Sequence, residues 1–336
     1  MTTDLNQKLG QLFFVGFQGY TLSDKTKHFL KTIQPGGIIL FKNNIKNKKQ
    51  VKNLIKEINN TLKIKPFIGT DQEGGRVQRL KKICTSVPSV WKLSKLGIKE
   101  LLKGQSIISS ELLELGFNAN FSPVLDINSN PKNPIIGKRK RAISSDPKIV
   151  SKYGAEIVKL FIKNKIIPIA KHFPGHGDVS LDSHLTLPVL KKTKKELNNF
   201  ELIPFKKAIQ NKVPIIMAAH IQLPKIEKDK KCPASLSRNV LKGMLRDKLG
   251  FKGLIITDEL NMKGITKNYK LEEASYKALT SGADILLFNH NEDSTLRAYE
   301  YLKEKMRIDK NLAKRITESY KMVMKTKNKY FTLRHD

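Results

Sequence analysis

Short apolar runs alternate with segments of helical periodicity along the whole chain. Eight runs have the length and composition of strands, at residues 11–17, 36–41, 65–71, 118–127, 166–172, 213–220, 253–259 and 283–290. Between them, apolar residues recur at helical spacing, as at 51–62, 150–161 and 240–249, and Gly250 supplies a stop signal for the last of these. The pattern predicts alternating strands and helices from end to end.

The strands are apolar on both faces, which is typical of a parallel sheet covered by helices. Eight strand–helix units in a chain of 336 residues predict an α/β protein with a (β/α)8 TIM-like barrel, and a doubly wound open sheet is the alternative. No Gly/Ser-rich or Pro-rich linker divides the chain. We therefore expect a single domain, with a core at about 9–291 and a C-terminal helix and tail at about 292–336.

The chain carries 63 Lys and Arg against 30 Asp and Glu, a formal net charge of +33. Such a balance raises nucleic-acid binding as a hypothesis. The lysines are scattered over most predicted helices, however, and the densest runs, at 138–141, 191–195 and 228–231, have no interleaved aromatic residues. A solvated basic surface without a nucleic-acid partner is the interpretation we prefer.

Features of the N-terminus and of the cysteines indicate a cytoplasmic protein. The first residues lack a basic region, and the apolar run at 12–17 is too short for a signal peptide or a membrane span. Cys84 and Cys232 are far apart and form no CxxC pair. We expect reduced thiols, no thiolate metal site and no membrane insertion.

Polar residues end several of the apolar runs. They are Asp71, Asp126, Lys171, His172, His220, Asp258, Asn289 and His290. The carboxyl ends of barrel strands form one rim, where barrel enzymes carry out their chemistry. A single Asp at such a position is usually a helix cap, but so many polar strand ends predict a concave polar site.

Two of these strand ends have distinctive surroundings. In "LIITDELNM", Asp258 is either the N-cap of a helix that begins near Leu260 or a rim carboxylate acting as nucleophile or stabilising positive charge. In "GTDQEGGRVQRL", Asp71 is followed by a double glycine and by Arg76 and Arg79. The Gly-Lys-Ser/Thr ending of a P-loop is missing, and carboxylate plus arginine suits a polyhydroxylated or anionic ligand.

The segment "KHFPGHGDVSLDSH", residues 171–184, contains three of the seven histidines. Its proline and glycines predict a long loop over the rim. A metal site would use His172, His176 and His184, but their spacing matches no zinc motif.

The end of the same loop offers a second chemistry. Asp182 and His184 lie two positions apart, so in extended backbone both side chains point to one side, and the carboxylate can orient the imidazole for proton transfer. Ser183 between them would point away, which speaks against a Ser-His-Asp triad. For His176 only a structural role is expected.

Several motifs occur together and in order: "GTDQEGGRVQRL", "NFSPVLDIN", "IAKHFPGHG" with "DSH", "PASLSRNVLKGMLRDKLGFKGLIITDELNM" and "GADILLFNHN". From about residue 9 to 291 the chain closely resembles glycoside hydrolase family 3, specifically its single-domain bacterial β-N-acetylglucosaminidases. The resemblance implies a barrel and a retaining mechanism through a covalent glycosyl-enzyme. It implies no cofactor and no metal.

The resemblance also implies roles for individual residues. Asp258 matches the nucleophile, and His184 with its partner Asp182 matches the acid/base. The residues that match sugar contacts are Asp71, Arg79, Lys171, His172 and an arginine after "NPIIG". Alignment on "SSDP" selects Arg141 for the last position, whereas counting forward from "IG" selects Arg139, and we predict Arg141.

The expected function is exo-acting release of terminal N-acetylglucosamine from peptidoglycan fragments, GlcNAc-β-1,4-anhydroMurNAc with or without peptide, by a cytoplasmic monomer. The substrate would be a muropeptide or a chitooligosaccharide-like chain. A family 3 β-glucosidase is an alternative, although its glutamate acid/base lies on a second domain for which this chain has no room. A phosphorylase and a non-enzymatic carbohydrate-binding barrel are two further hypotheses.

Overall fold

The computed structural model describes residues 4–183 and 185–332. Eight strands form one sheet in the order β10-β1-β2-β3-β6-β7-β8-β9. They are β1 (Phe13–Val15), β2 (Gly37–Ile39), β3 (Phe67–Thr70), β6 (Ala119–Asn120), β7 (Ile167–Phe173), β8 (Ile215–Ala218), β9 (Leu254–Thr257) and β10 (Leu286–Phe288). Each neighbouring pair is parallel. A parallel bridge between Ile256 and Ile285 joins the two ends of the sheet, so the sheet closes into a barrel.

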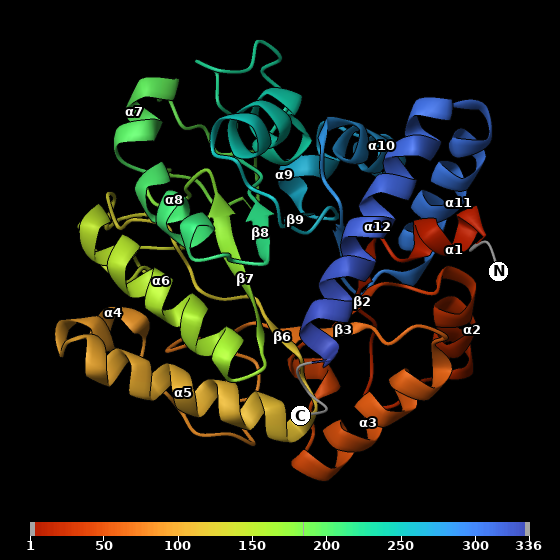
Figure 1. The fold of residues 1–336 in the computed structure, drawn as a ribbon, viewed down its shortest axis with the longest axis horizontal. Helices are drawn as coiled ribbons and strands as arrows, with labels where there is room; N and C mark the ends of the chain where they lie inside the picture. Colours follow the sequence, from red (N-terminus) through yellow and green to blue (C-terminus); the bar gives the residue numbers. More distant parts are fainter. Residues whose placement is uncertain (1–3, 184, 333–336) are drawn as a thin grey trace.

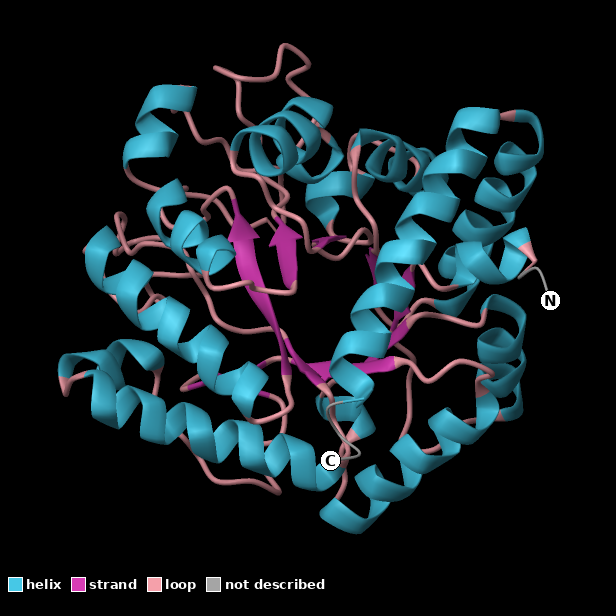
Figure 2. Ribbon diagram, viewed as in Figure 1, coloured by secondary structure: helices cyan, strands magenta, loops and turns pink. Residues whose placement is uncertain are grey.

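The barrel confirms the predicted fold class and excludes the open sheet. Each of the eight predicted runs overlaps one of these observed strands. β4 (Gln72–Gly74) and β5 (Val77–Gln78) form a separate antiparallel hairpin directly after β3. Figure 2 shows the strands at the centre of the molecule with the helices around them.

Alternate strand residues fill the barrel interior. Phe14, Phe67, Phe121, Ile169 and Met217 belong to one buried cluster, and the rings of Phe14 and Phe121 meet edge to face at 5.3 Å. A second, larger cluster lies between the strands and the surrounding helices. Each strand therefore buries both faces, which explains why the runs are apolar without alternation.

Helices surround the barrel (Figure 1). They are α1 (Leu5–Gly10), α2 (Asp24–Ile33), α3 (Lys48–Thr61), α4 (Val90–Lys95), α5 (Ile98–Leu115), α6 (Pro147–Lys163), α7 (Lys194–Asn199), α8 (Leu202–Gln210), α9 (Lys263–Thr266), α10 (Leu271–Ser281), α11 (Glu292–Ile308) and α12 (Lys310–Thr332), with the 3₁₀ turns η1 (Lys42–Asn44) and η2 (Ala234–Leu236) and the π-helix η3 (Asn239–Lys248). The three predicted helical segments correspond to α3, α6 and η3. Within the described ranges, no helix is both long and apolar enough to cross a bilayer.

Local sequence signals set where several helices begin and end. The side chains of Ser23 and Asn47 accept hydrogen bonds from backbone N–H groups in the first turns of α2 and α3. Asp146 caps α6 just before Pro147 at its first position. Gly250, with φ of +66°, lies just beyond the end of η3, in the conformation that favours glycine.

α12 lies across the N-terminal mouth of the barrel (Figure 1). Val323 and Tyr330 belong to the interior cluster, and the ring of Phe331 meets that of Phe67 at 5.6 Å. Lys327 lies on the buried face of α12 and donates a 2.7 Å hydrogen bond to the side chain of Gln11. α12 therefore closes one end of the barrel and leaves the C-terminal ends of the strands for the site. Residues 333–336 of the expected tail lie outside the described part of the chain.

Candidate active site

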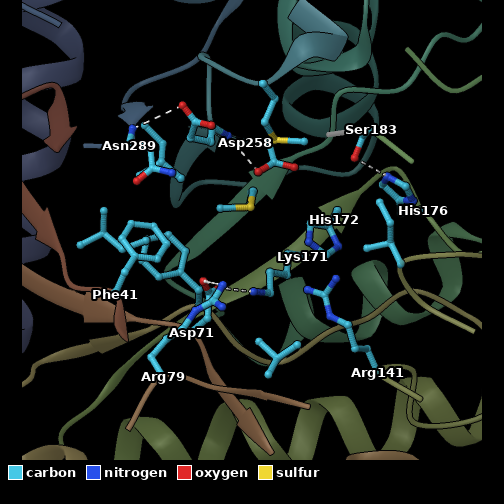
Figure 3. A pocket seen from close by; sticks show the side chains of 18 of the residues that line it. Phe41, Asp71, Arg79, Arg141, Lys171, His172, His176, Ser183, Asp258 and Asn289 are labelled. Carbon is cyan, nitrogen blue, oxygen red and sulfur yellow. Dashed lines mark hydrogen bonds and ion pairs between the residues drawn. The ribbon is translucent and has the colours of Figure 1, made fainter. Parts of the chain in front are cut away.

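A cavity of about 530 Å³ lies at the C-terminal ends of the strands (Figure 3). Of the eight residues given a catalytic or sugar-binding role from the sequence, six line it: Asp71, Arg79, Arg141, Lys171, His172 and Asp258. Asp182 is described but does not line the cavity, and His184 lies outside the described residues. Arg139, the alternative to Arg141, also lines the cavity.

A chain of alternating charges forms one side of the cavity. Lys171 Nζ lies 2.7 Å from Asp71 Oδ1 and 2.8 Å from Glu73 Oε1. Arg79 Nη2 lies 2.9 Å from Asp71 Oδ2, and Arg141 binds Glu73 through Nη2 and Nε at 2.7 and 2.8 Å. The order of contacts is therefore Arg79, Asp71, Lys171, Glu73 and Arg141, and positive and negative charges alternate along it. Fixed in this way, the Asp71 carboxylate and its cations form a rigid polar surface.

Electrostatics keeps both carboxylates of this chain ionised. Burial by itself raises the pKa of Asp71, but the positive charges of Lys171 and Arg79 outweigh it and hold that pKa well below its usual range. Burial likewise opposes ionisation of Glu73, and Arg141 with Lys171 lowers its pKa to about 2. Burial opposes the charge of Arg141, but the charge of Glu73 and its hydrogen bonds to Arg141 raise the pKa of the guanidinium.

Glu73 was not predicted from the sequence. It belongs to β4 of the short hairpin after β3, and Gly74 and Gly75 take positive φ values of 101° and 63° beside it. The hairpin returns the chain so that Arg79 meets Asp71. Asp71 and Glu73 are two positions apart in an extended segment, and this spacing is the signal that could have placed both on one side.

A second network orients His172. Asp126 is fully buried, and its Oδ2 lies 2.6 Å from His172 Nδ1, while its Oδ1 accepts hydrogen bonds from the backbone N–H of His172 and of His176. Burial opposes the charge of Asp126, but His172 and these hydrogen bonds lower its pKa. An ionised carboxylate can only accept hydrogen bonds. His172 therefore donates to Asp126 from Nδ1.

His176 connects this network to the predicted catalytic loop. Its Nε2 lies 3.1 Å from Ser183 Oγ, and both residues line the cavity (Figure 3). Burial and the neighbouring His172 lower the pKa of His176 to about 4, so the ring is neutral near pH 7. Ser183 is itself buried, and its carbonyl accepts a 3.3 Å hydrogen bond from Gly264 N–H. His176 therefore contacts the loop at Ser183, directly after Asp182.

The loop between β7 and α7 has no helix among its described residues, which confirms the predicted loop. The Asp182 carbonyl accepts hydrogen bonds from Leu185 and Thr186 N–H at 3.0 Å each. These bonds hold the Asp182 carbonyl in place, and the expectation for the D-x-H spacing includes His184, which lies outside the described residues. A Cβ at Gly177 would come within 1.6 Å of the Ile127 carbonyl oxygen, so the loop packs tightly there and requires glycine.

Asp258 follows β9 at the opposite side of the cavity from the charged chain (Figure 3). Its backbone N–H donates to the Ala218 carbonyl at 2.8 Å, and its Oδ1 accepts from Glu259 N–H at 2.8 Å. No helix begins near Leu260 in the described chain, because α9 starts only at Lys263 with Met262 as its N-cap. The N-cap alternative for Asp258 is therefore wrong.

Glu259 lines the cavity beside Asp258 and was also missed from the sequence. Its Oε1 accepts hydrogen bonds from the backbone N–H of Asn261 at 2.7 Å and of Asn289 at 3.4 Å. Burial, helped by the charge of Asp258, raises the pKa of Glu259 to about 7. The predicted rim residue His220 does not line the cavity: it holds the Glu259 carbonyl at 2.8 Å and Ser235 Oγ at 2.7 Å.

The histidines do not converge on an ion in the described residues. The rings of His172 and His176 lie 5.8 Å apart, and the described chain contains no group of three His, Cys, Asp or Glu side chains that could hold a metal. The arrangement instead combines the strand-end carboxylate of Asp258, a fixed set of cations and carboxylates, and two oriented histidines. These groups suit recognition of a ligand with many hydroxyl groups and acid–base chemistry at one bond.

The model of the glycosyl hydrolase family 3 N-terminal domain matches residues 4–326. The chain belongs to glycosyl hydrolase family 3. It is 34% identical to the beta-hexosaminidase of Photobacterium profundum over 92% of this chain and 91% of that protein. It is 33% identical to beta-hexosaminidase A of Pseudoalteromonas piscicida over 84% of this chain, and spans 53% of the length of that relative.

Solved family 3 structures have the same fold. A β-N-acetylglucosaminidase from Paenibacillus sp. aligns with a TM-score of 0.93 and 37% identity, over 98% of this chain and 63% of that one. NagZ from Neisseria gonorrhoeae in complex with N-trifluoroacetyl-D-glucosamine aligns with a TM-score of 0.78 and 29% identity, over 94% of this chain and 93% of that one. The predicted family and enzyme class, a family 3 glycoside hydrolase of the β-hexosaminidase type, are confirmed.

Proposed function

We propose that the chain is an exo-acting, retaining β-N-acetylglucosaminidase that releases terminal N-acetylglucosamine from peptidoglycan fragments. The observation that supports this most strongly is the convergence of Asp258 and the Asp71–Lys171 ion pair in one cavity of about 530 Å³. The N. gonorrhoeae relative in complex with N-trifluoroacetyl-D-glucosamine supports an N-acylated glucosamine as the sugar. The expected cytoplasmic location and monomeric state stay predictions.

The proposed first step is displacement at the anomeric carbon. The Asp258 carboxylate forms a bond to that carbon while the bond to the leaving oxygen breaks, and the imidazolium of His184 gives its proton to that oxygen. In the second step neutral His184 takes a proton from water, the water oxygen bonds to the anomeric carbon, and Asp258 leaves as a carboxylate. Asp182 would stabilise the charged imidazole in the first step. A histidine in place of the usual second carboxylate fits proton transfer near neutral pH.

The charged chain and His172 would hold the sugar. Asp71 accepts and Lys171 donates hydrogen bonds, so the two groups together suit neighbouring hydroxyls. Arg79 and Arg141 fix these groups in place and present further donors. Since every member is already paired, little side-chain freedom is lost when the sugar binds. We assign the sugar-binding role to Arg141, whereas Arg139 is assigned to the aglycone.

Two further arginines line the cavity and support an anionic aglycone. Arg76 and Arg139 are exposed, and neither forms an ion pair with any carboxylate of the described residues. Guanidinium groups without a partner attract carboxylates in a bidentate geometry. The lactyl carboxylate of anhydro-muramic acid is such a group. We therefore assign Arg76 and Arg139 to the aglycone and Arg141 to the sugar side.

The function is tested with 4-nitrophenyl N-acetyl-β-glucosaminide and the matching β-glucoside. Hydrolysis of the first at a rate at least about 100-fold above the second is expected, because a site that holds the N-acetyl group would lose those contacts with a glucoside. Asp258→Ala and His184→Ala should each lower kcat by about 10³-fold or more. Equal activity on both substrates, or unchanged turnover in both variants, would remove the assignment.

A phosphorylase is separated by the same assay. Inorganic phosphate also suits two unpaired arginines, so turnover is compared in phosphate and in a zwitterionic buffer. A hydrolase shows equal rates and releases free N-acetylglucosamine in both. Release of N-acetylglucosamine 1-phosphate would identify a phosphorylase. The aglycone assignment is tested with Arg76→Gln/Arg139→Gln, which should raise KM for the anionic disaccharide and leave KM for the neutral 4-nitrophenyl substrate unchanged.

A further inference from the structure

A second hollow lies at the other end of the barrel from the active site. Its volume is about 700 Å³, and it is formed by the end of α8, the residues just before β8, the end of η3 with the loop that leads to β9, and the C-terminal half of α12. Val213, Phe251 and Met322 give it an apolar wall. This volume lies within the range that takes a small organic molecule.

The charged side chains in this hollow all carry the same sign. They are Lys212, Arg246, Lys252, Lys325 and Lys329, and no Asp or Glu of the described residues lines it. By contrast, the active-site cavity contains Asp71, Asp258 and Glu259, and each of three other hollows contains at least one carboxylate. The lysine-rich composition of the chain is therefore compatible with hollows that contain both positive and negative side chains. The absence of a carboxylate is specific to this hollow among the five compared in the described residues.

One of the five cations shapes the wall. Arg246 binds the Asp284 carboxylate and donates to the carbonyls of Phe251 and Gly253, and its guanidinium lies 5.3 Å from the centre of the Phe251 ring. It is already partnered. Arg246 thus fixes the loop before β9 and leaves the four lysines as the groups that face a ligand.

The lysines lack anionic partners. Lys212, Lys252, Lys325 and Lys329 form no ion pair within the described ranges, and Lys329 packs over the Tyr330 ring at 5.0 Å. Lys212 and Lys252 follow the ends of α8 and η3, whose carbonyl groups favour a cation, which accounts for part of their placement. Lys325 and Lys329 are four residues apart on α12, where like charges repel.

We propose that this hollow binds an organic phosphate of at least two negative charges, with the phosphates on Lys252, Lys325 and Lys329 and the organic body against Met322 and Val213. An anion removes the repulsion between the lysines, which is the energetic reason for binding. Concavity and the apolar wall favour a small molecule over nucleic acid, which would use an open basic surface with stacking aromatics. The proposal is independent of the chemistry at the active site.

The test measures binding of adenosine triphosphate and of inorganic triphosphate by calorimetry in 0.1 M salt. Lys252→Gln/Lys325→Gln/Lys329→Gln is compared with Lys49→Gln/Lys56→Gln/Lys103→Gln, which removes three exposed lysines of α3 and α5 and changes the net charge equally. The first triple variant should lose about tenfold or more in affinity for both anions, and the second about twofold or less. Thermal melting checks that both variants fold.

Met322→Ala tests whether the organic part of the ligand packs against Met322. It should weaken binding of adenosine triphosphate several-fold and leave inorganic triphosphate unchanged, because only the nucleotide has an apolar part to place on Met322. Equal losses in the two triple variants would show nonspecific attraction to a basic protein and overturn the site. Absence of binding of either anion to the unaltered protein at millimolar concentration would overturn it as well.

Discussion

Lys171 Nζ lies 2.7 Å from Asp71 Oδ1, and this contact joins β7 to the end of β3 on one side of the cavity. The lysine is 2% exposed and meets Glu73 at 2.8 Å as well. A buried cation between two carboxylates is held by geometry, because removal of any one charge leaves the others uncompensated. The same contact therefore determines the stability of this part of the barrel and the shape of the sugar-binding surface.

Replacement of Lys171 by methionine should cost about 3–5 kcal/mol of unfolding free energy, since it leaves two buried carboxylates each with a single arginine. Urea denaturation measures this cost. Lys159→Met is the matched control: its ion pair with Glu156 is exposed, and its loss should cost less than about 1 kcal/mol. The double variant Lys171→Met/Asp71→Asn should recover part of the stability but none of the activity. A double variant no more stable than Lys171→Met alone would contradict the charge argument.

The fold could be predicted because its signals are local and strong. Each strand is apolar on both faces and each intervening helix is amphipathic, so eight repeats specify a barrel. Seven of the eight predicted strands are too long, as at 118–127, where β6 covers only Ala119–Asn120. Pro123 has no N–H to continue the ladder, and beyond it the pairing with β7 is reduced to an isolated bridge between Val124 and Lys171.

The site could be predicted only in part. Residues at strand ends were found because the barrel brings all such ends to one rim. Glu73 and Glu259 were missed because each lies beside a more obvious aspartate. The contact of His176 with Ser183 was missed because it depends on how a glycine-rich loop folds back, which no periodicity encodes. Sequence spacing also left Arg139 and Arg141 unresolved, and both line the cavity.

Loss of the Ser183 hydroxyl should slow the proposed reaction without weakening substrate binding. Ser183→Ala removes the hydrogen bond to His176 Nε2, which fixes the loop next to Asp182. We expect kcat to fall about tenfold with KM changed less than about twofold, because only positioning of the acid/base is affected. The control is Ser275→Ala, another buried serine, whose hydroxyl bonds to Leu271 O within α10 and should leave kcat unchanged. Equal kcat values for Ser183→Ala and the unaltered enzyme would refute the positioning role.

Glu259 should make the protein less stable as pH rises between about 5 and 8. Its pKa is raised from 4.5 to about 7, so in this window the folded chain binds more protons than the unfolded chain. The stabilisation is complete below pH 4.5 and is lost as pH rises through 7, about 2 kcal/mol in all over the measured range. Urea denaturation at pH 5, 6, 7 and 8 should show this decline, and Glu259→Gln should flatten it. Glu304→Gln, at an exposed position on α11, is expected to keep the decline; the same flattening there would exclude Glu259 as the cause.

Lys327 should act in the opposite direction and in a higher pH window. The ammonium is buried where α12 crosses the barrel mouth, with Gln11 as its hydrogen-bond partner and the Phe67 ring at 5.2 Å. Burial lowers its pKa from 10.5 to about 7, so between these values the unfolded chain binds more protons than the folded chain. The free energy of unfolding should therefore rise by about 2 kcal/mol from pH 7 to 9, and it should fall by the same amount when the pH is lowered from 9 to 7.

Lys327→Met keeps most of the length of the side chain and removes the titrating group, so the unfolding free energy of this variant should change little between pH 7 and 9. Lys321→Met, an exposed position on the same helix, should retain the rise seen in the unaltered protein. The comparison is made by urea denaturation of the three proteins at matched ionic strength, which keeps the repulsion of the other cations nearly equal. Parallel slopes for Lys327→Met and the unaltered protein would mean that Lys327 stays protonated inside the barrel, with Gln11 and the Phe67 ring sufficient to hold its charge.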